Sequence, residues 1–327
     1  MSQTTDIKIK NALGEANLFT VVSHIRPDGD AIGSMLALGT ALKNAGKKVH
    51  FVLQDKPGSR YDYLVNFAEI MHTMPQDAGY LIVVDCSDAQ RTGEILGGRK
   101  PDLVIDHHKT NAEFGIINLI EPDTEATCLV LAQHLPAWGF SVDSGVANAL
   151  LTGIVADTIG FRTSNTSPNC LKKAAELMEA GANLAFVYQR VLLSRSLEEL
   201  RYWGQGLSKL NLDDGLLWTS LSLADRMRAG YEGNDDADLV NNMTTVSDMF
   251  IAVICVEQSE DRTKVSWRSR EGFDVSALAR EFGGGGHAAA AGADLSGDLQ
   301  SVMDRVLART RQYLIETRGI HLKAGSL

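Results

Sequence analysis

The 327-residue sequence has little cysteine, little proline and no long apolar run. Its four cysteines lie far apart and form no Cys-x-x-Cys pair, which disfavours a zinc ribbon or a redox dithiol and predicts reduced, partly buried thiols. Seven prolines are too few for a proline-rich fibre, and no apolar run approaches the ~18 residues that a membrane helix needs. The first 20 residues lack a basic segment followed by an apolar core, so we expect no secretory signal, no membrane partner and a cytoplasmic location.

Positive charge is also scarce, because 31 Lys and Arg residues stand against 41 Asp and Glu residues, for a net charge of −10. This balance disfavours a protein that holds a long duplex by its phosphates, since that class carries an extended basic surface. Apolar residues make up 44% and charged residues 22%, which indicates a folded globular chain, and the length favours about two domains.

Short apolar runs alternate with helical patterns in the first half of the sequence. Strands are predicted at residues 18–22, 49–53, 81–84 and 103–105. Helices are predicted at residues 31–45, 126–151 and 169–193. Continuous apolar strands separated by helices predict an α/β fold whose parallel sheet is buried on both faces. In such sheets the functional loops gather at the carboxyl ends of the strands.

The second half begins with a predicted connecting helix over residues 197–210 and then becomes richer in strands. The strands are expected at residues 216–223, 249–258 and 263–270, with helices near 237–246, 274–282 and 298–317. We therefore divide the chain into a catalytic domain over 1–186, a helical connector over 187–214 and a smaller α/β domain over 215–327. We expect a cleft between the two domains.

Four groups of acidic residues and histidines end apolar segments of the first half. They are His24-x-x-x-Asp28-x-Asp30, Asp85, Asp106-His107-His108 and Asp157. One Asp at a strand end is commonly a helix N-cap, but four groups bring up to five carboxylates and three imidazoles to one sheet edge. Such crowding is strongly unfavourable without cations, so the pattern predicts bound divalent metals. Carboxylates with a few imidazoles and no thiolate suit Mn²⁺, with Mg²⁺, Co²⁺ or Zn²⁺ as competitors.

The ligands exceed what one ion needs, which favours two ions bridged by a carboxylate, as in hydrolysis of phosphate esters. The motifs HIRPDGDAIGS, VVDCSD, VIDHHKTN and GIVADTIGFRTSNTS, in this order over residues 20–170, resemble those of the DHH phosphoesterase superfamily. That superfamily includes the RecJ exonucleases, the family II pyrophosphatases and the NrnA-type oligoribonucleases. The resemblance implies one Mn²⁺ held by His24, Asp28 and Asp85, and a second held by Asp30, Asp85, His107 and Asp157. It also implies that His108 contacts the scissile phosphate or protonates the leaving oxygen, and that Asp106 orients a histidine.

A glycine-rich stretch, residues 283–286, precedes His287 and an alanine run. It is either a flexible connection or a phosphate cradle, in which the alanine run starts a helix aimed at the anion. The strand before it places five polar side chains on the face opposite Val265 and Trp267, as a solvated face or as a phosphate-binding wall. The five are Arg262, Lys264, Ser266, Arg268 and Arg270.

The combination of RSR at 268–270 with GGGGHAAAAG resembles the DHHA1 domain, which grips the distal end of the substrate in NrnA-type proteins. The resemblance implies a mixed sheet in this domain and substrate contacts from Arg268, Ser269, Arg270, Gly285, Gly286 and His287. Arg162, in DTIGFR, either contacts the transferred phosphate or forms a salt bridge with one of the many acids.

The sequence therefore predicts a Mn²⁺-dependent hydrolase of short single-stranded RNA, acting through water activated between two metals. We expect it also to remove the 3′-phosphate of adenosine 3′,5′-bisphosphate. The alternatives are a phosphodiesterase of cyclic di-AMP or its linear product, a family II-like pyrophosphatase, and a nucleotide-binding protein without catalysis. Related proteins are often dimers, so a homodimer is a further expectation.

Overall fold

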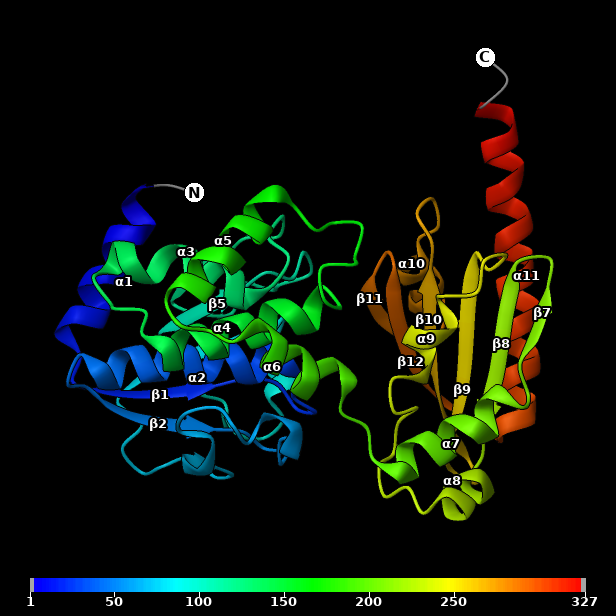
Figure 1. Cartoon of the computed structure of the whole chain (residues 1–327), viewed down its shortest axis with the longest axis horizontal. Helices are drawn as coiled ribbons and strands as arrows, with labels where there is room; N and C mark the ends of the chain where they lie inside the picture. The colour runs from blue at the N-terminus through cyan, green and yellow to red at the C-terminus, as the bar shows by residue number, and fades with distance from the viewer. Residues whose placement is uncertain (1–2, 325–327) are drawn as a thin grey trace. The chain divides into compact units, whose positions relative to one another are not determined.

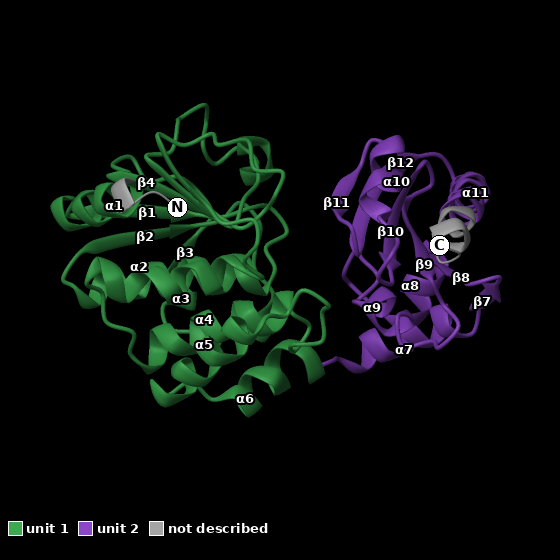
Figure 2. Ribbon diagram, turned by 90° about the horizontal axis from the view of Figure 1, so that it is seen from above, with its two compact units in different colours: residues 1–194 green, residues 195–327 purple. Residues whose placement is uncertain are grey.

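The computed structural model describes the backbone of residues 3–324 and the side chains of residues 5–317. The chain divides into two compact units, residues 1–194 and residues 195–327, coloured separately in Figure 2. Each unit has its own six-stranded sheet and its own hydrophobic core. Within the described residues, no helix combines the length and the apolar character needed to cross a membrane. All four cysteines are free, as predicted, and all four are fully buried rather than partly buried.

Unit 1 is built on a parallel sheet with the strand order β3-β2-β1-β4-β5-β6. The strands are β1 (Leu18–Val22), β2 (Lys48–Val52), β3 (Ile70–Met71), β4 (Tyr80–Val84), β5 (Leu103–Asp106) and β6 (Ile117–Ile120). Nearly every residue of β1, β4 and β5 is buried, which confirms the predicted sheet with two covered faces. After β1, the strands β2 and β3 are added on one side of β1, and the strands β4, β5 and β6 are added on the other side. The position between β1 and β4 is therefore a topological switch point, where open α/β sheets bind their ligands.

Helices cover the sheet of unit 1 (Figure 1). They are α1 (Gln3–Glu15), α2 (Gly29–Asn44), α3 (Thr127–Trp138), α4 (Ser144–Asp157), α5 (Pro168–Glu179) and α6 (Leu184–Tyr188), with a π-helical turn at Gln189–Leu193. The short 3₁₀ turns are η1 (Ser59–Tyr61), η2 (Phe67–Glu69) and η3 (Ala89–Thr92).

The sequence predicted two long continuous helices in unit 1, and both predictions are wrong because each segment is interrupted. The segment 126–151 is two helices, since Gly139 adopts a left-handed conformation that ends α3 and the Asp143 carboxylate caps α4. The segment 169–193 is divided in the same way, by Gly181 with φ of 102° and by the Asn183 cap of α6.

The packing of α2 on α4 depends on two glycines. A Cβ at Gly33 would lie 2.5 Å from the carbonyl oxygen of Ala149, and a Cβ at Gly153 would lie 2.4 Å from an oxygen of Asp30. Any larger side chain would push the two helices apart. This close approach brings Asp157, the last residue of α4, to the amino end of α2.

Unit 2 contains a mixed sheet with the strand order β11-β12-β10-β9-β8-β7, in which only the described pair β8–β9 is parallel. The strands are β7 (Asn211–Asp213), β8 (Leu216–Leu221), β9 (Ile251–Ser259), β10 (Arg262–Ser269), β11 (Gly285–His287) and β12 (Ala290–Ser296). The helices are α7 (Leu197–Leu207), α8 (Leu223–Ala229), α9 (Leu239–Met243), α10 (Val275–Glu281) and α11 (Leu299–Ala324). Val265 and Trp267 are fully buried in one core beside residues of α10 and α11, which confirms the side of the sheet predicted for them.

The alanine run after His287 does not start a helix, so that prediction is wrong. Residues 290–296 form β12, whose alternate residues Ala291 and Ala293 are buried. The glycine-rich stretch pairs with this strand through Gly285 opposite Gly292 and forms a hairpin at the edge of the sheet. A Cβ at Gly284 would lie 2.1 Å from the carbonyl oxygen of Gly292, so close strand packing outweighs the helix propensity of alanine here.

Candidate active site

The predicted ligands gather at the carboxyl ends of three neighbouring strands. His24 follows β1, Asp85 follows β4, and Asp106 is the last residue of β5. Because β1, β4 and β5 are adjacent, their carboxyl ends place these residues together at the switch point of the sheet. Asp157 joins them from the end of α4.

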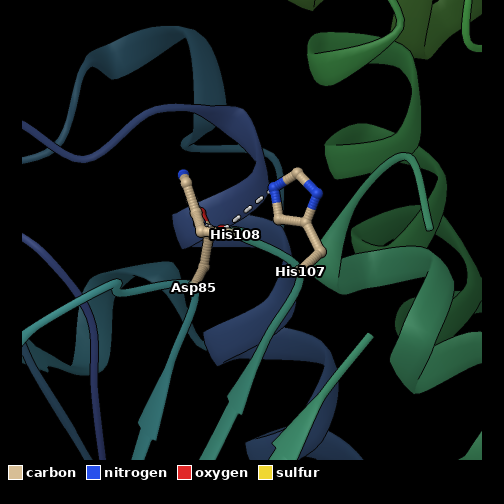
Figure 3. A group of neighbouring side chains, drawn as sticks. All are labelled: Asp85, His107 and His108. Atoms are coloured by element: carbon tan, nitrogen blue, oxygen red, sulfur yellow. Dashed lines mark ion pairs between the residues drawn. The ribbon is translucent and has the colours of Figure 1, made fainter. Parts of the chain in front are cut away.

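Three overlapping groups of side chains at this edge could each hold a metal ion, with their ligand atoms within 4.8 Å of one another. The groups are His24, Asp28 and Asp85; Asp30, His107 and Asp157; and Asp85, His107 and His108. Figure 3 shows the last group, with Asp85 pointing toward the two imidazoles. All six predicted metal ligands and His108 thus lie in one cluster.

Asp85 faces two sets of ligands with its two oxygens. Its Oδ2 lies 3.6 Å from Nε2 of His24, while its Oδ1 lies 3.8 Å from Nε2 of His107. Burial alone raises the pKa of Asp85, but the hydrogen-bonded His24 and the nearby His108 bring that pKa well below its usual range. An ionised carboxylate that faces both ways has the geometry of a bridging ligand.

Backbone carbonyls fix the orientation of two histidines. Nδ1 of His24 donates to the carbonyl of Ile25 at 2.8 Å, and Nδ1 of His107 donates to the carbonyl of Thr124 at 3.1 Å. Each ring therefore turns Nε2 toward the carboxylates, which is the usual arrangement of a metal-binding imidazole. Burial lowers the pKa of His24, yet the hydrogen-bonded Asp85 and the charge of Asp28 raise it to about 9.

Asp28 has two roles, since one oxygen caps a helix and the other faces the site. Its Oδ1 accepts from the backbone amides of Asp30 and Ala31 at the start of α2. Its Oδ2 lies 4.0 Å from Nε2 of His24. Asp28 can therefore cap α2 with one oxygen and still offer the other oxygen to a metal ion.

The buried acids show why a cation fits this cluster. Burial raises the pKa of Asp30 well above its usual range, and the charges of Asp85 and Asp157 raise it further. Burial also raises the pKa of Asp157. These three carboxylates ionise together only at a high electrostatic cost, which a divalent cation removes.

The donor atoms also agree with a hard or borderline metal. They are imidazole nitrogens and carboxylate oxygens, while the nearby thiols stay protonated, because burial raises the pKa of Cys86 to about 12 and that of Cys128 well above its usual value. Nitrogen and oxygen ligands without thiolate suit Mn²⁺, Mg²⁺, Co²⁺ or Zn²⁺.

Asp106 is fully buried and holds His108. Its Oδ1 accepts from Nδ1 of His108 at 2.7 Å and from the backbone amide of His107 at 2.9 Å. Its Oδ2 accepts from the Asn111 side chain at 2.6 Å. Burial lowers the pKa of His108, but the hydrogen bond to Asp106 and the charge of Asp85 give a net rise. The imidazole is thereby held with Nε2 directed away from Asp106.

The predicted substrate residues divide between the two units. Arg162 is exposed in unit 1, and its Nε donates to the carbonyl of Ile159 at 3.3 Å; no ion pair of Arg162 occurs among the described residues. In unit 2, Ser269 lies next to the glycine–histidine hairpin, because its hydroxyl donates to the carbonyl of Ala288 at 3.0 Å. Gly285, Gly286 and His287 form the exposed edge strand β11.

Two predicted substrate arginines make hydrogen bonds inside unit 2. Arg268 donates through Nε to Asn241 at 2.9 Å and through Nη1 to the carbonyl of Trp267 at 2.9 Å. Burial lowers the pKa of Arg268, while the charge of Asp236 raises it. Arg270 is exposed and donates to the carbonyl of Val246 at 3.1 Å. Arg268 therefore ties α9 to the sheet, whereas Arg270 remains accessible from solvent.

Sequence reasoning missed the loop before α3 and the first turn of α3, although together they contact three of the predicted ligands. The carbonyl of Thr124 in the loop orients His107, the amides of Thr127 and Cys128 donate to Asp30, and the Thr127 hydroxyl donates to Asp85. The only available signal was the threonine-rich segment TEATC at the start of a predicted helix. Asn111, five positions after Asp106, was also missed, because its hydrogen bond to the Asp106 carboxylate forms only in the folded chain.

Two family descriptions match this chain. The DHH family, N-terminal domain, matches residues 18–154, and the DHHA1 domain matches residues 222–316. The chain is 35% identical over 298 residues to the bifunctional oligoribonuclease and PAP phosphatase NrnA of Thermus thermophilus, covering 90% of this chain and 89% of that protein.

Solved structures show the same fold. An exopolyphosphatase-related protein from Bacteroides fragilis superposes with a TM-score of 0.87 at 23% identity, covering 98% of both chains. RecJ from Thermus thermophilus in complex with Mn²⁺ superposes with a TM-score of 0.55 at 13% identity, covering 96% of this chain and 54% of RecJ. From the two matched domains and the 35% identity to NrnA, the chain belongs to the DHH–DHHA1 phosphoesterase family.

Proposed function

We propose that this chain hydrolyses short RNA oligonucleotides and adenosine 3′,5′-bisphosphate and that it depends on two Mn²⁺ ions. The observation that carries the proposal is the position of Asp85, whose two oxygens face separate sets of ligands. The names of the relatives support the choice of substrates, because NrnA of Thermus thermophilus and NrnA of Bacillus subtilis are both described as acting on oligoribonucleotides and PAP.

The residues for the two metal positions are those already predicted. His24, Asp28 and Asp85 would hold one ion, and Asp30, Asp85, His107 and Asp157 would hold the other. When bound, the ions supply positive charge for the phosphate oxygens and activate a water. Sequence pattern and chemistry favour Mn²⁺ among the hard and borderline metals.

His108 supplies the proton in this proposal. Burial lowers the pKa of His108, but the hydrogen bond to Asp106 gives a net rise, which favours the charged imidazole; Asp106 also holds the ring through Nδ1, so that Nε2 would donate to the leaving oxygen. General acids of this kind contribute roughly 10²–10⁴-fold to the rate. Arg162 has an exposed guanidinium and would contact the phosphate that is being transferred.

Unit 2 would bind the rest of the nucleotide through β11 and its neighbours. A Cβ at Gly285 would meet nothing within 4 Å, so the backbone there is open to an approaching anion. His287 and Arg270 are exposed near Ser269 and would supply the charged and polar contacts. Arg268 would act indirectly, by holding α9 in place.

A substrate panel tests the proposal. Wild-type protein and the Asp85→Ala variant are incubated with Mn²⁺ and either a labelled diribonucleotide, adenosine 3′,5′-bisphosphate, cyclic di-AMP, its linear product, or pyrophosphate. We expect the wild type to hydrolyse the first two substrates and Asp85→Ala to hydrolyse neither. Faster hydrolysis of cyclic di-AMP or of pyrophosphate would refute the substrate assignment, and equal activity of the variant would refute the site. The homodimer and the cytoplasmic location stay predictions.

A further inference from the structure

Thr127, the first residue of α3, donates hydrogen bonds to two different carboxylates of the candidate active site. Its backbone N–H donates to Oδ2 of Asp30 at 2.6 Å. Its hydroxyl donates to Oδ1 of Asp85 at 3.0 Å. The side chain of Thr127 is fully buried. One residue thus contacts both Asp30 and Asp85.

The backbone of Asp85 is already fixed, so its side chain is the part that needs orientation. Asp85 has a left-handed φ of 52°, and its N–H donates to the carbonyl of Ile105 at 2.9 Å. The carboxylate can still rotate about its own side-chain bonds. His24 contacts one of its oxygens, and the Thr127 hydroxyl holds the other, Oδ1, on the side of His107.

We propose that Thr127 is a positioning residue that orients Asp85 as the shared ligand of the two metal positions. This inference rests on the proposed function, because it assumes that the cluster binds two ions. The Thr127 hydroxyl donates to Oδ1, which is the oxygen that lies 3.8 Å from Nε2 of His107. Its loss therefore weakens chiefly the metal position formed with His107, Asp30 and Asp157.

The contacts of Thr127 allow the hydroxyl to be tested separately from the rest of the residue. In Thr127→Val the backbone donors to Asp30 from positions 127 and 128 remain, and only the bond to Asp85 is lost. Thr127→Ser keeps the hydroxyl and removes a methyl group. Thr20→Val is a matched control, because Thr20 is a buried threonine of unit 1 whose hydroxyl donates to the carbonyl of Ala78 at 2.6 Å.

The experiment is a calorimetric Mn²⁺ titration of metal-free, full-length protein, with thermal unfolding of each variant as the check on folding. We expect Thr127→Val to weaken one of the two Mn²⁺ binding events by about 10–100-fold, which is the usual effect of removing a residue that hydrogen-bonds a metal ligand. The affinity of the other binding event should stay within about threefold of wild type. Thr127→Ser and Thr20→Val should bind both ions within about threefold of wild type. If Thr127→Val does not fold, Thr127→Ala supplies the second variant without the hydroxyl.

The outcomes separate the two proposals. Wild-type affinity for both ions in folded Thr127→Val, or an equal loss in Thr127→Ser, overturns the role of the hydroxyl while the proposed function stands. A wild-type protein that binds no Mn²⁺ overturns the proposed function and the positioning role with it. A folded Thr127→Val that loses both binding events equally overturns the assignment to one metal position.

Discussion

The contact between Asp106 and His108 leads to a prediction about how the leaving group is protonated. In Asp106→Asn, the oxygen that remains can still accept from His108 and from the amide of His107. The new amide nitrogen then faces the Asn111 side-chain nitrogen across the present 2.6 Å contact, and two donors cannot pair. A buried donor without a partner costs about 1–3 kcal/mol, so we expect the free energy of unfolding to fall by that amount.

The effect on activity should exceed the effect on stability. Without the negative charge of residue 106, the imidazolium of His108 loses its principal support, and the general-acid contribution of about 10²–10⁴-fold is at risk. The loss should depend on the leaving group. We expect Asp106→Asn to lower kcat at least 100-fold on a diribonucleotide, within that range, but less than about tenfold on a 4-nitrophenyl phosphodiester, whose leaving group needs no proton.

A variant that perturbs the same cluster without touching His108 serves as the control. Asn111→Ala removes the hydrogen bond that the Asn111 side chain donates to Oδ2 of Asp106 and should cost similar stability, yet it leaves the 2.7 Å contact with His108 in place. We expect its kcat on both substrates to stay within about tenfold of wild type, because the general acid is retained. Equal losses on the two substrates in Asp106→Asn would refute the role of His108 as the acid.

Three further predictions follow from the structure. Gly285→Ala should leave the melting temperature unchanged and raise KM at least tenfold. Gly284→Ala should instead lower the melting temperature, because its Cβ would lie 2.1 Å from the carbonyl oxygen of Gly292. Equal effects of the two changes on the melting temperature would contradict the open edge at Gly285. His134 forms hydrogen bonds with Asp6 and Glu121. Burial lowers the pKa of His134, but Glu121 and Asp6 give a net rise. The stabilisation is therefore complete below the pKa of the unfolded state, about 6.5, and is lost as the pH rises through the higher pKa of the folded state. The difference in unfolding free energy between wild type and His134→Gln should therefore shrink from about pH 6 upward, and a difference that grows with pH would refute the assignment. Removal of metal by a chelator should lower the melting temperature. Added Mn²⁺ at about 100 times its Kd should restore about 2.7 kcal/mol of unfolding free energy for each ion bound, and no shift would argue against a metal centre.

The parallel sheet and the cluster at its edge could be predicted because both depend on short-range patterns. The strands around residues 18–22 and 81–84 are continuous apolar runs, and a run buried on both faces is legible in the sequence. The acids and histidines that end these strands necessarily meet, because parallel strands share one carboxyl edge. The cluster around Asp85 therefore needed no knowledge of distant contacts.

The features that were missed depend on contacts between distant segments. Thr127 meets Asp30 across 97 positions, and nothing in a single threonine at a helix start announces that partner. The alanine run of 288–291 has the composition of a helix, but its first two residues form the turn of the hairpin and its last two pair with β10 and β11 as the start of β12. The predicted cationic face of β10 likewise gave no sign that Arg268 would bond Asn241 of α9.

The close packing of α2 on α4 has a consequence for the order in which the site can form during synthesis. The acids and histidines at the ends of β1, β4 and β5 leave the ribosome before Asp157, because α4 comes after these three strands in the sequence. Until α4 docks against Gly33, and Gly153 settles beside Asp30, an emerging chain carries only part of the cluster. Full assembly of the cluster thus waits for nearly half of the polypeptide.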